Sequence, residues 1–160
     1  MKFVHIADVH FDIPFRTLAE RANLGQKRRM EQREAFKKVI DFIKDEKVDY
    51  LFISGDLYEE ENIRKTTIDY INNLFKEIKN TKIFIAPGNH DPYLKNSYYS
   101  IYNWSENVKI FTNKVEVIKY EDIDIYGYGF NDFEMSENQL ENIKVENIEK
   151  MNILITHGDL

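Results

Sequence analysis

Three of the four histidines stand where short apolar runs end, each close to an Asp, Asn or Gly. His10 lies two residues after Asp8, His90 follows Asn89, and His157 closes a run near the end of the chain. Imidazole nitrogens and carboxylate or amide oxygens are ligands for divalent metal ions, and an imidazole can also transfer a proton. The pattern therefore indicates a metal-dependent site built from side chains remote in sequence.

The first two clusters are Asp8 with His10, and Asp56. A spacing of two on an extended strand end points both side chains of the first pair to the same side. Gly55 lets the chain turn sharply while the Asp56 carboxylate projects beyond the strand, and a carboxylate can bridge two cations because each oxygen can bind one. The ordinary alternatives are a solvated acid with a core-edge histidine, and a turn aspartate.

The segment Gly88 to Asp91 is the most specific cluster. The amide oxygen of Asn89 is a neutral, hard ligand for a divalent cation, and the adjacent His90 can face a substrate instead of the metal. A simple turn does not explain why a histidine and an aspartate follow the asparagine. For His157 a polar strand end is as ordinary an interpretation as a metal ligand.

Apolar runs precede all of these clusters and predict buried strands over residues 2–7, 48–54, 82–86 and 151–156. Between the first three runs, apolar stripes at helical spacing predict two helices, one through Phe36, Val39, Ile40 and Ile43 and one through Ile68, Ile71, Phe75 and Ile78. This alternation indicates parallel βαβ units, in which sites form at the carboxyl ends of the strands. All four clusters, including the one after residues 151–156, are therefore expected at one rim of a single sheet. His5 falls within the first strand and is assigned to packing.

The middle of the chain differs from this pattern. After a Tyr- and Asn-rich loop at 93–104, three short β-rich runs at 108–111, 115–120 and 123–128 predict an antiparallel portion. The segment Ser136 to Gln139 has the form of a capping box, so a short helix is expected before the last strand. The fold class is predicted to be α/β.

Composition narrows the function classes. The 160 residues are 42% hydrophobic and 14% aromatic, enough for one compact domain with a core. The absence of cysteine excludes disulfides and thiolate metal sites, and a formal charge of −6 argues against nucleic-acid binding through a general positive field. Without a long apolar run or a signal-peptide pattern, we expect a soluble, cytoplasmic protein with no membrane partner.

These clusters, in this order, resemble the signature of the calcineurin-like metallophosphoesterases: Asp8-Val9-His10, Gly55-Asp56, Gly88-Asn89-His90-Asp91 and His157-Gly158. Within that superfamily, the segments from His5 to Phe15 and from Ser54 to Tyr58 are most similar to SbcD-type DNA repair exonucleases. The resemblance spans essentially the whole chain and implies an α/β/β/α sandwich. The family has a further Gly-His-x-His motif downstream, so residues 1–160 are expected to be the N-terminal part of a catalytic domain, without two metal ligands, the closing strands and the capping region.

The resemblance also implies roles for the site residues. One cation would take Asp8, His10 and Asp56, and the other Asp56, Asn89 and His157. His90 would protonate the leaving oxygen or stabilise the phosphate, with Asp91 as an orienting group. The family prefers manganese, although ligand chemistry alone does not separate manganese from iron, zinc or magnesium. With one ligand missing from each cation, weak or absent activity is expected of these 160 residues.

The partners implied by the resemblance are DNA, an SbcC-like ATPase subunit and a second copy of the protein. Candidates for DNA contact are the basic residues Lys27, Arg28, Arg29 and Arg33, although a solvated helix face is the more ordinary interpretation. Two other functions stay open. One is a phosphodiesterase or phosphatase for small nucleotides or phosphoproteins, and the other is a non-catalytic assembly module.

Overall fold

The computed structural model describes residues 1–14, 24–135 and 139–158. The elements in chain order are β1 (Phe3–Ile6), α1 (Leu24–Asp45), β2 (Tyr50–Ser54), α2 (Lys65–Glu77), β3 (Lys82–Ala86), α3 (Tyr98–Ile101), β4 (Val108–Ile110), β5 (Glu116–Lys119), β6 (Ile123–Gly127), the 3-10 helix η2 (Gln139–Asn142) and β7 (Met151–Ile155). The first four strands form a parallel sheet in the order β1-β2-β3-β4. In the second sheet, β6 pairs antiparallel with β5 and parallel with β7.

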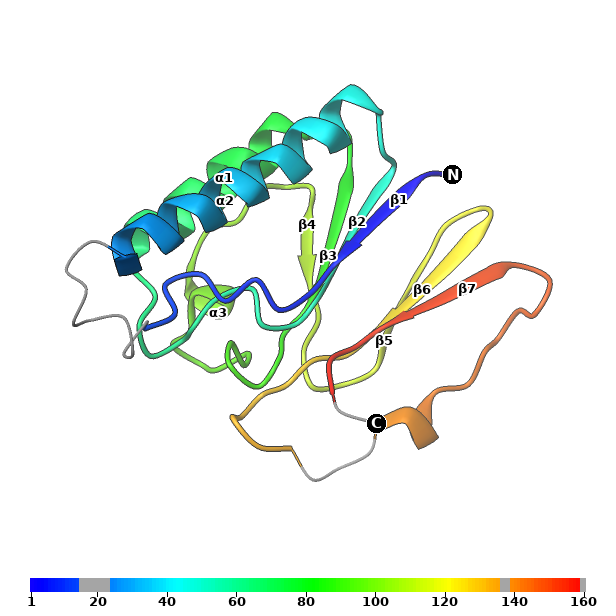
Figure 1. The fold of residues 1–160 in the computed structure, drawn as a ribbon. Helices are drawn as coiled ribbons and strands as arrows, with labels where there is room; N and C mark the ends of the chain where they lie inside the picture. The colour runs from blue at the N-terminus through cyan, green and yellow to red at the C-terminus, as the bar shows by residue number, and fades with distance from the viewer. Residues whose placement is uncertain (15–23, 136–138, 159–160) are drawn as a thin grey trace.

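Two hydrophobic cores hold these layers together. Helices α1 and α2 cover one face of the first sheet, and the second sheet packs against the other face (Figure 1). The predicted helical stripes lie in the first core, where Phe36, Ile40, Ile68 and Ile71 are buried against the sheet. The second core lies between the sheets and is rich in aromatic side chains, with Phe52, Phe84, Phe111, Ile125 and Ile155 among its members. Strands β2 and β3 are therefore buried on both faces, as central parallel strands are.

The α/β prediction and the antiparallel pairing of β5 with β6 are confirmed, but two strand placements were wrong. The run at 108–111 was expected in the antiparallel portion, whereas β4 pairs parallel with β3. The side-chain amide of Asn107 anchors the start of β4 by donating to the carbonyl oxygens of Phe75, Ile78 and Thr81 at 3.0–3.3 Å. The last strand, β7, joins the second sheet instead of the first. A short β-rich run can pair in either direction, so its packing against neighbouring strands determines which sheet it joins.

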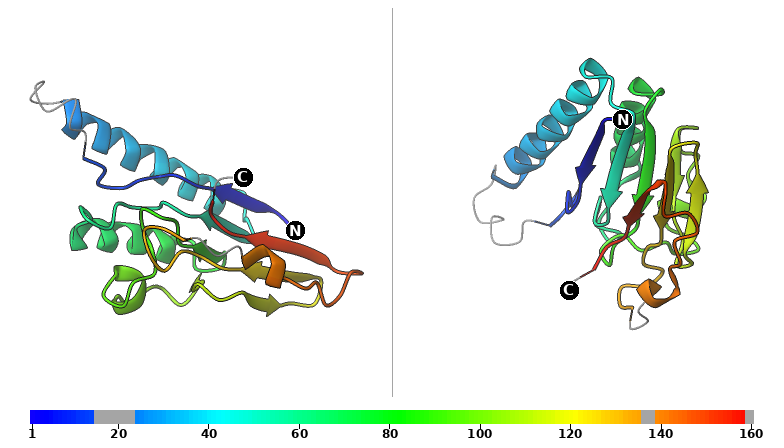
Figure 2. Two further views of the ribbon diagram at one scale, coloured as in Figure 1. Left: turned by 90° about the horizontal axis from the view of Figure 1, so that it is seen from below. Right: turned by 90° about the vertical axis from the view of Figure 1, so that its right-hand side faces the viewer.

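Strand β1 is half exposed, although the sequence predicted a buried strand. It is an edge strand, and Phe3 keeps 53% of its surface exposed. His5 is also exposed, and its Nε2 lies 2.9 Å from the Ser54 hydroxyl, so the assignment of this histidine to packing was wrong. Figure 2 shows β1 beside β7, and an open groove of 420 Å³ separates these two sheet edges.

Smaller elements also differ from the prediction. The predicted loop at 93–104 contains the short helix α3, and η2 takes the place of the expected helix before the last strand. Residues 136–138 of the predicted capping box lie outside the described residues. Among the helices that the structure describes, none is long and apolar enough to cross a membrane.

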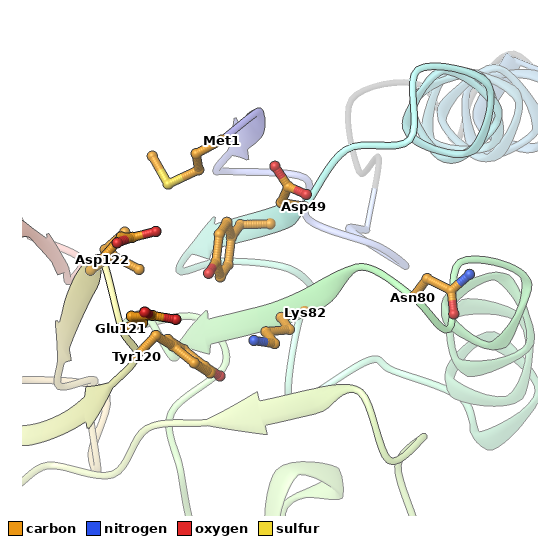
Figure 3. A pocket seen from close by; sticks show the side chains of 9 residues that line it. Met1, Asp49, Asn80, Lys82, Tyr120, Glu121 and Asp122 are labelled. Carbon is orange, nitrogen blue, oxygen red and sulfur yellow. The ribbon is translucent and has the colours of Figure 1, made fainter.

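A cavity of 520 Å³ lies at the amino ends of β2, β3 and β6 (Figure 3). Its wall includes Asp49, Tyr50, Asp122 and Lys82, and the ammonium of Lys82 lies 3.5 Å from the centre of the Tyr120 ring. The clusters singled out in the sequence lie at the opposite, carboxyl ends of the strands. This cavity is therefore separate from the candidate site.

Candidate metal centre

The segments that follow β1 and β2 are bonded together at one rim of the fold. The amide of Asp8 donates to the Gly55 carbonyl at 3.2 Å, and the amide of His10 donates to the Asp56 carbonyl at 2.8 Å. Asp8, His10 and Asp56 all have left-handed backbone, with φ of 55°, 52° and 54°. The prediction that Asp8 and His10 extend strand β1 was therefore wrong, because β1 ends at Ile6 and a strained loop presents both side chains.

Two glycines allow the loops to approach closely. A Cβ atom on Gly55, whose φ is +79°, would lie 2.3 Å from Nδ1 of His157. A Cβ atom on Gly88 would lie 2.2 Å from Oδ1 of Asp56. Any side chain at these positions would displace a predicted metal ligand. The sequence predicted the sharp turn at Gly55 but not this second reason for glycine.

Asp56 lies at the centre of the site and is almost fully buried. Its Oδ1 accepts a hydrogen bond from the His90 amide at 3.0 Å. Its Oδ2 lies 3.6 Å from Nε2 of His10 and 3.4 Å from Nε2 of His157. One oxygen therefore faces both imidazoles, whereas the sequence argument assigned one oxygen to each cation.

His157 reaches the rim from the second sheet. Its Nδ1 lies 3.0 Å from the Ser54 carbonyl oxygen, which can only accept a hydrogen bond, so Nδ1 carries the proton in the neutral ring. Its Nε2 then presents a lone pair to the amide oxygen of Asn89, 3.1 Å away, and to Oδ2 of Asp56. Three lone-pair donors thus face one another, an arrangement that a cation would stabilise.

His10 shows the same division of its two nitrogens. Its Nδ1 lies 2.8 Å from Oε1 of Glu59, which fixes that nitrogen as the donor in the neutral ring. Its Nε2 faces Asp56 and lies 4.0 Å from Oδ1 of Asp8. The ring is also held through its backbone, because the side-chain amide of Gln32 on α1 donates to the His10 carbonyl at 3.0 Å.

Glu59 is the functional candidate that sequence reasoning missed. Its Oε1 contacts His10 and its Oε2 lies 3.1 Å from Nδ1 of His90, so one carboxylate holds two imidazoles whose rings are 4.9 Å apart. Burial lowers the pKa of His90, but the hydrogen bond and charge of Glu59 outweigh it, so the pKa lies above the ordinary 6.5. The only sequence signal was an acidic residue in the turn after Asp56.

Asp91 does not contact the His90 ring in the hydrogen-bond network. It is fully buried, and its carboxylate accepts hydrogen bonds from the amides of Asp56, Leu57 and Gly88 and from the Tyr99 hydroxyl. Burial raises the pKa of Asp91 to about 6, although these hydrogen bonds oppose the shift. The group that orients His90 in the structure is Glu59.

The five predicted ligands come together, and their donor set fits divalent cations. Ligand atoms of Asp8, Asp56 and His157 lie within 4.8 Å of one another, and those of His10, Glu59 and His90 do the same. Oxygen and imidazole donors without thiolates suit manganese, iron, zinc or magnesium. The geometry can hold two cations, with Asp56 between the His10 side and the His157 side.

The predicted DNA-contact residues lie along the first turns of α1. Arg28 pairs with Glu31 at 2.9 Å, and Lys27 lies 3.9 Å from the same carboxylate. Arg33 donates to the Thr67 hydroxyl at 2.8 Å and stacks over the Tyr70 ring, so it supports the packing of α1 on α2. Arg29 is exposed, and no ion pair links it to another residue of the described ranges.

Comparison with known proteins agrees with this geometry. The family model described as calcineurin-like phosphoesterase matches residues 1–160. An uncharacterized metallophosphoesterase of Bacillus subtilis strain 168, YhaO, is 27% identical over 169 aligned residues, which cover 100% of this chain and 41% of that protein. The chain therefore spans well under half the length of this relative. Because this family model matches all of residues 1–160, the chain belongs to the calcineurin-like phosphoesterase family.

Proposed function

We propose that this chain forms the dinuclear metal site of a hydrolase that cleaves phosphodiesters in DNA and works with an SbcC-like ATPase. The observation that carries the metal site is the position of Asp56. Its Oδ2 faces His10 and His157, whose other ring nitrogens are already held by Glu59 and by the Ser54 carbonyl. Both Nε2 lone pairs therefore point to one shared carboxylate.

The protein's own residues divide into two sets. Asp8 and His10 would hold one cation, Asn89 and His157 the other, and Asp56 would be shared. When bound, such a pair of cations neutralises phosphate charge and activates a water nucleophile. The Nδ1 contacts of the two histidines fix their tautomers, which keeps the lone pairs directed inward before any metal arrives.

His90 is placed to handle the leaving group. Its side chain is 46% exposed beside the buried Asp56, so it can reach a phosphate at the rim. Glu59 holds Nδ1, which leaves Nε2 as the nitrogen that can donate a proton to the leaving oxygen. Because Glu59 raises the pKa of His90, the ring carries this proton at higher pH than an isolated histidine.

The choice of DNA as substrate rests on the resemblance to SbcD-type exonucleases and on Arg29, an exposed basic residue in the first turns of α1. A second candidate is a phosphodiesterase or phosphatase for small nucleotides. Three observations favour this second candidate: the formal charge of −6, the pairing of Lys27 and Arg28 with Glu31, and the structural use of Arg33. Each of these weakens an electrostatic grip on a long polyanion.

The deciding experiment uses the full-length protein and compares its activity on different substrates. Manganese-dependent release of nucleotides from linear DNA is measured beside hydrolysis of an aryl phosphodiester and of a cyclic nucleotide. The DNA proposal predicts cleavage of DNA that the His90→Asn variant loses. Efficient hydrolysis of the small esters without DNA cleavage would select the second candidate, and unchanged cleavage by His90→Asn would remove the proton-donor role.

A further inference from the structure

The buried carboxylate of Asp91 joins two of the ligand-bearing loops. Its Oδ1 accepts the amides of Asp56 and Gly88 at 2.9 and 2.7 Å, and its Oδ2 accepts the amide of Leu57 at 2.6 Å. Asp56 and Leu57 follow β2, whereas Gly88 follows β3. One side chain therefore fixes the separation of the two loops that carry Asp56 and Asn89.

The fourth donor to Asp91 comes from outside the site. The hydroxyl of Tyr99 on α3 donates to Oδ2 at 2.6 Å. Tyr99 is only 4% exposed, and its ring packs 4.9 Å from the Tyr58 ring and 6.1 Å from the Trp104 ring. A phenylalanine would fill the same space, so the hydroxyl is needed only for the bond to Asp91.

The conformation that this contact supports is strained. Asp56 has left-handed backbone, a conformation that is unfavourable for a non-glycine residue and persists only where its surroundings hold it. The bond from its amide to Asp91 is one such restraint. The Asp56 carbonyl in turn accepts the His10 amide, so the restraint continues to the loop after β1.

We propose that Tyr99 and Asp91 form a positioning pair that holds Asp56 in the orientation needed to share two cations. The inference rests on the proposed metal site but assigns no chemistry to either residue. Tyr99 orients the Asp91 carboxylate, Asp91 fixes the amides on both loops, and Asp56 is thereby directed between His10 and His157. Neither Tyr99 nor Asp91 would contact the cations.

The test compares Tyr99→Phe with a matched control, Tyr126→Phe. Tyr126 is equally buried at 4% exposure, and its hydroxyl takes part in a partly buried hydrogen bond, accepting the Glu146 amide at 3.2 Å. Both variants remove one oxygen and keep the ring. Three quantities are measured on the purified chain: the Kd for Mn²⁺, the visible absorption bands of bound Co²⁺, and amide hydrogen exchange at Leu57 and Gly88 without metal.

The proposal predicts that Tyr99→Phe raises the Kd for Mn²⁺ about tenfold or more, since losing an outer-shell partner of a metal site has this effect. The Co²⁺ bands shift and the exchange of Leu57 and Gly88 accelerates, whereas Tyr126→Phe changes none of the three. Asp91→Asn is the second variant and reproduces the loss, because an amide nitrogen cannot accept from a backbone N–H.

Two results would overturn the inference. The first is that Tyr99→Phe lowers thermal stability as Tyr126→Phe does but keeps the Mn²⁺ affinity, the Co²⁺ bands and the amide exchange. The second is that the unmodified chain binds neither metal at the rim, which would remove the metal site as well. Metal binding that is weakened by Tyr99→Phe, in a protein that hydrolyses no phosphoester, would keep the positioning pair and reject the proposed function.

Discussion

Oδ2 of Asp56 lies 3.4 Å from Nε2 of His157, although Asp56 follows a strand of the first sheet and His157 follows a strand of the second. The candidate centre is therefore assembled across the interface between the two sheets. Its geometry depends on the aromatic core that sets their separation. Packing remote from the ligands should consequently affect metal binding.

Phe111→Ala tests this dependence. The Phe111 side chain is 0% exposed, stacks 6.1 Å from Phe84, and lies where a Cβ atom on Gly127 would clash with it. Removing the ring leaves a cavity between the sheets, so the free energy of unfolding should fall by about 3–5 kcal/mol. Urea denaturation measures this loss, and metal affinity should fall with it. The control Phe42→Ala, at a helix position 56% exposed, should change stability by less than about 0.5 kcal/mol.

Gly88→Ala tests the close approach of the two ligand loops. The new methyl group would lie 2.2 Å from Oδ1 of Asp56 and 2.8 Å from its backbone nitrogen. Since backbone cannot yield as a flexible side chain does, Asp56 should shift out of line with the two histidines. We expect an affinity for Mn²⁺ reduced at least about tenfold by calorimetry. Affinity equal to that of the unmodified chain would show that Asp56 is not held as described.

Much of this arrangement follows from the sequence, and the exceptions have physical reasons. Apolar runs and helical stripes predict β2, α1, α2 and β3 because these elements bury whole faces. The assignment of β4 and β7 to sheets failed because a run of three to five β-formers does not specify its partner strand. The gathering of Asp8, His10, Asp56 and Asn89 was predictable from parallel topology, since the carboxyl ends of parallel strands meet at one rim. His157 reaches this rim from the second sheet, which the parallel pattern did not predict.

Glu59→Gln tests the link between this carboxylate and His90. The pKa of His90 is raised in the folded protein, so the pair stabilises the fold at pH below the unfolded value, and this contribution disappears as pH rises through the folded pKa. Titration of the His90 ring by NMR, without metal, should give a pKa above 6.5 in the unmodified protein and a lower one in Glu59→Gln. The control Glu61→Gln, at an exposed neighbour, should leave the pKa in place. An unchanged titration in Glu59→Gln would show that the contact is not formed in solution.

The role of Glu59 could not be predicted from the sequence. Its spacing from Asp56 carries no periodic signal, and a glutamate in a turn is ordinary surface chemistry. Its role comes from the bridge between Phe11 and Tyr58, which brings the loop after β1 against the turn after β2. Contacts of this kind depend on loop conformation, which apolar patterning does not specify.

Two basic residues of α1 are expected to have different roles, one in DNA contact and one in structural support. Under the DNA proposal, Arg29→Ala should weaken binding to duplexes of any sequence and lower the salt-dependence slope by about 1. Arg33→Ala should instead lower thermal stability, because it removes the contacts with Thr67 and Tyr70. Fluorescence anisotropy at several salt concentrations and a melting curve measure the two effects. Equal DNA affinity for Arg29→Ala and the unmodified protein would contradict the proposed contact.

The central claim is that Asp8, His10, Asp56, Asn89 and His157 bind divalent cations at one rim. Paramagnetic line broadening tests it most directly, because substoichiometric Mn²⁺ broadens NMR signals of nearby nuclei even when binding is weak. We predict selective loss of the amide signals around Asp8, Asp56 and His157, and no such loss in Asp56→Asn. Broadening centred elsewhere, or the same pattern in Asp56→Asn, would contradict the account.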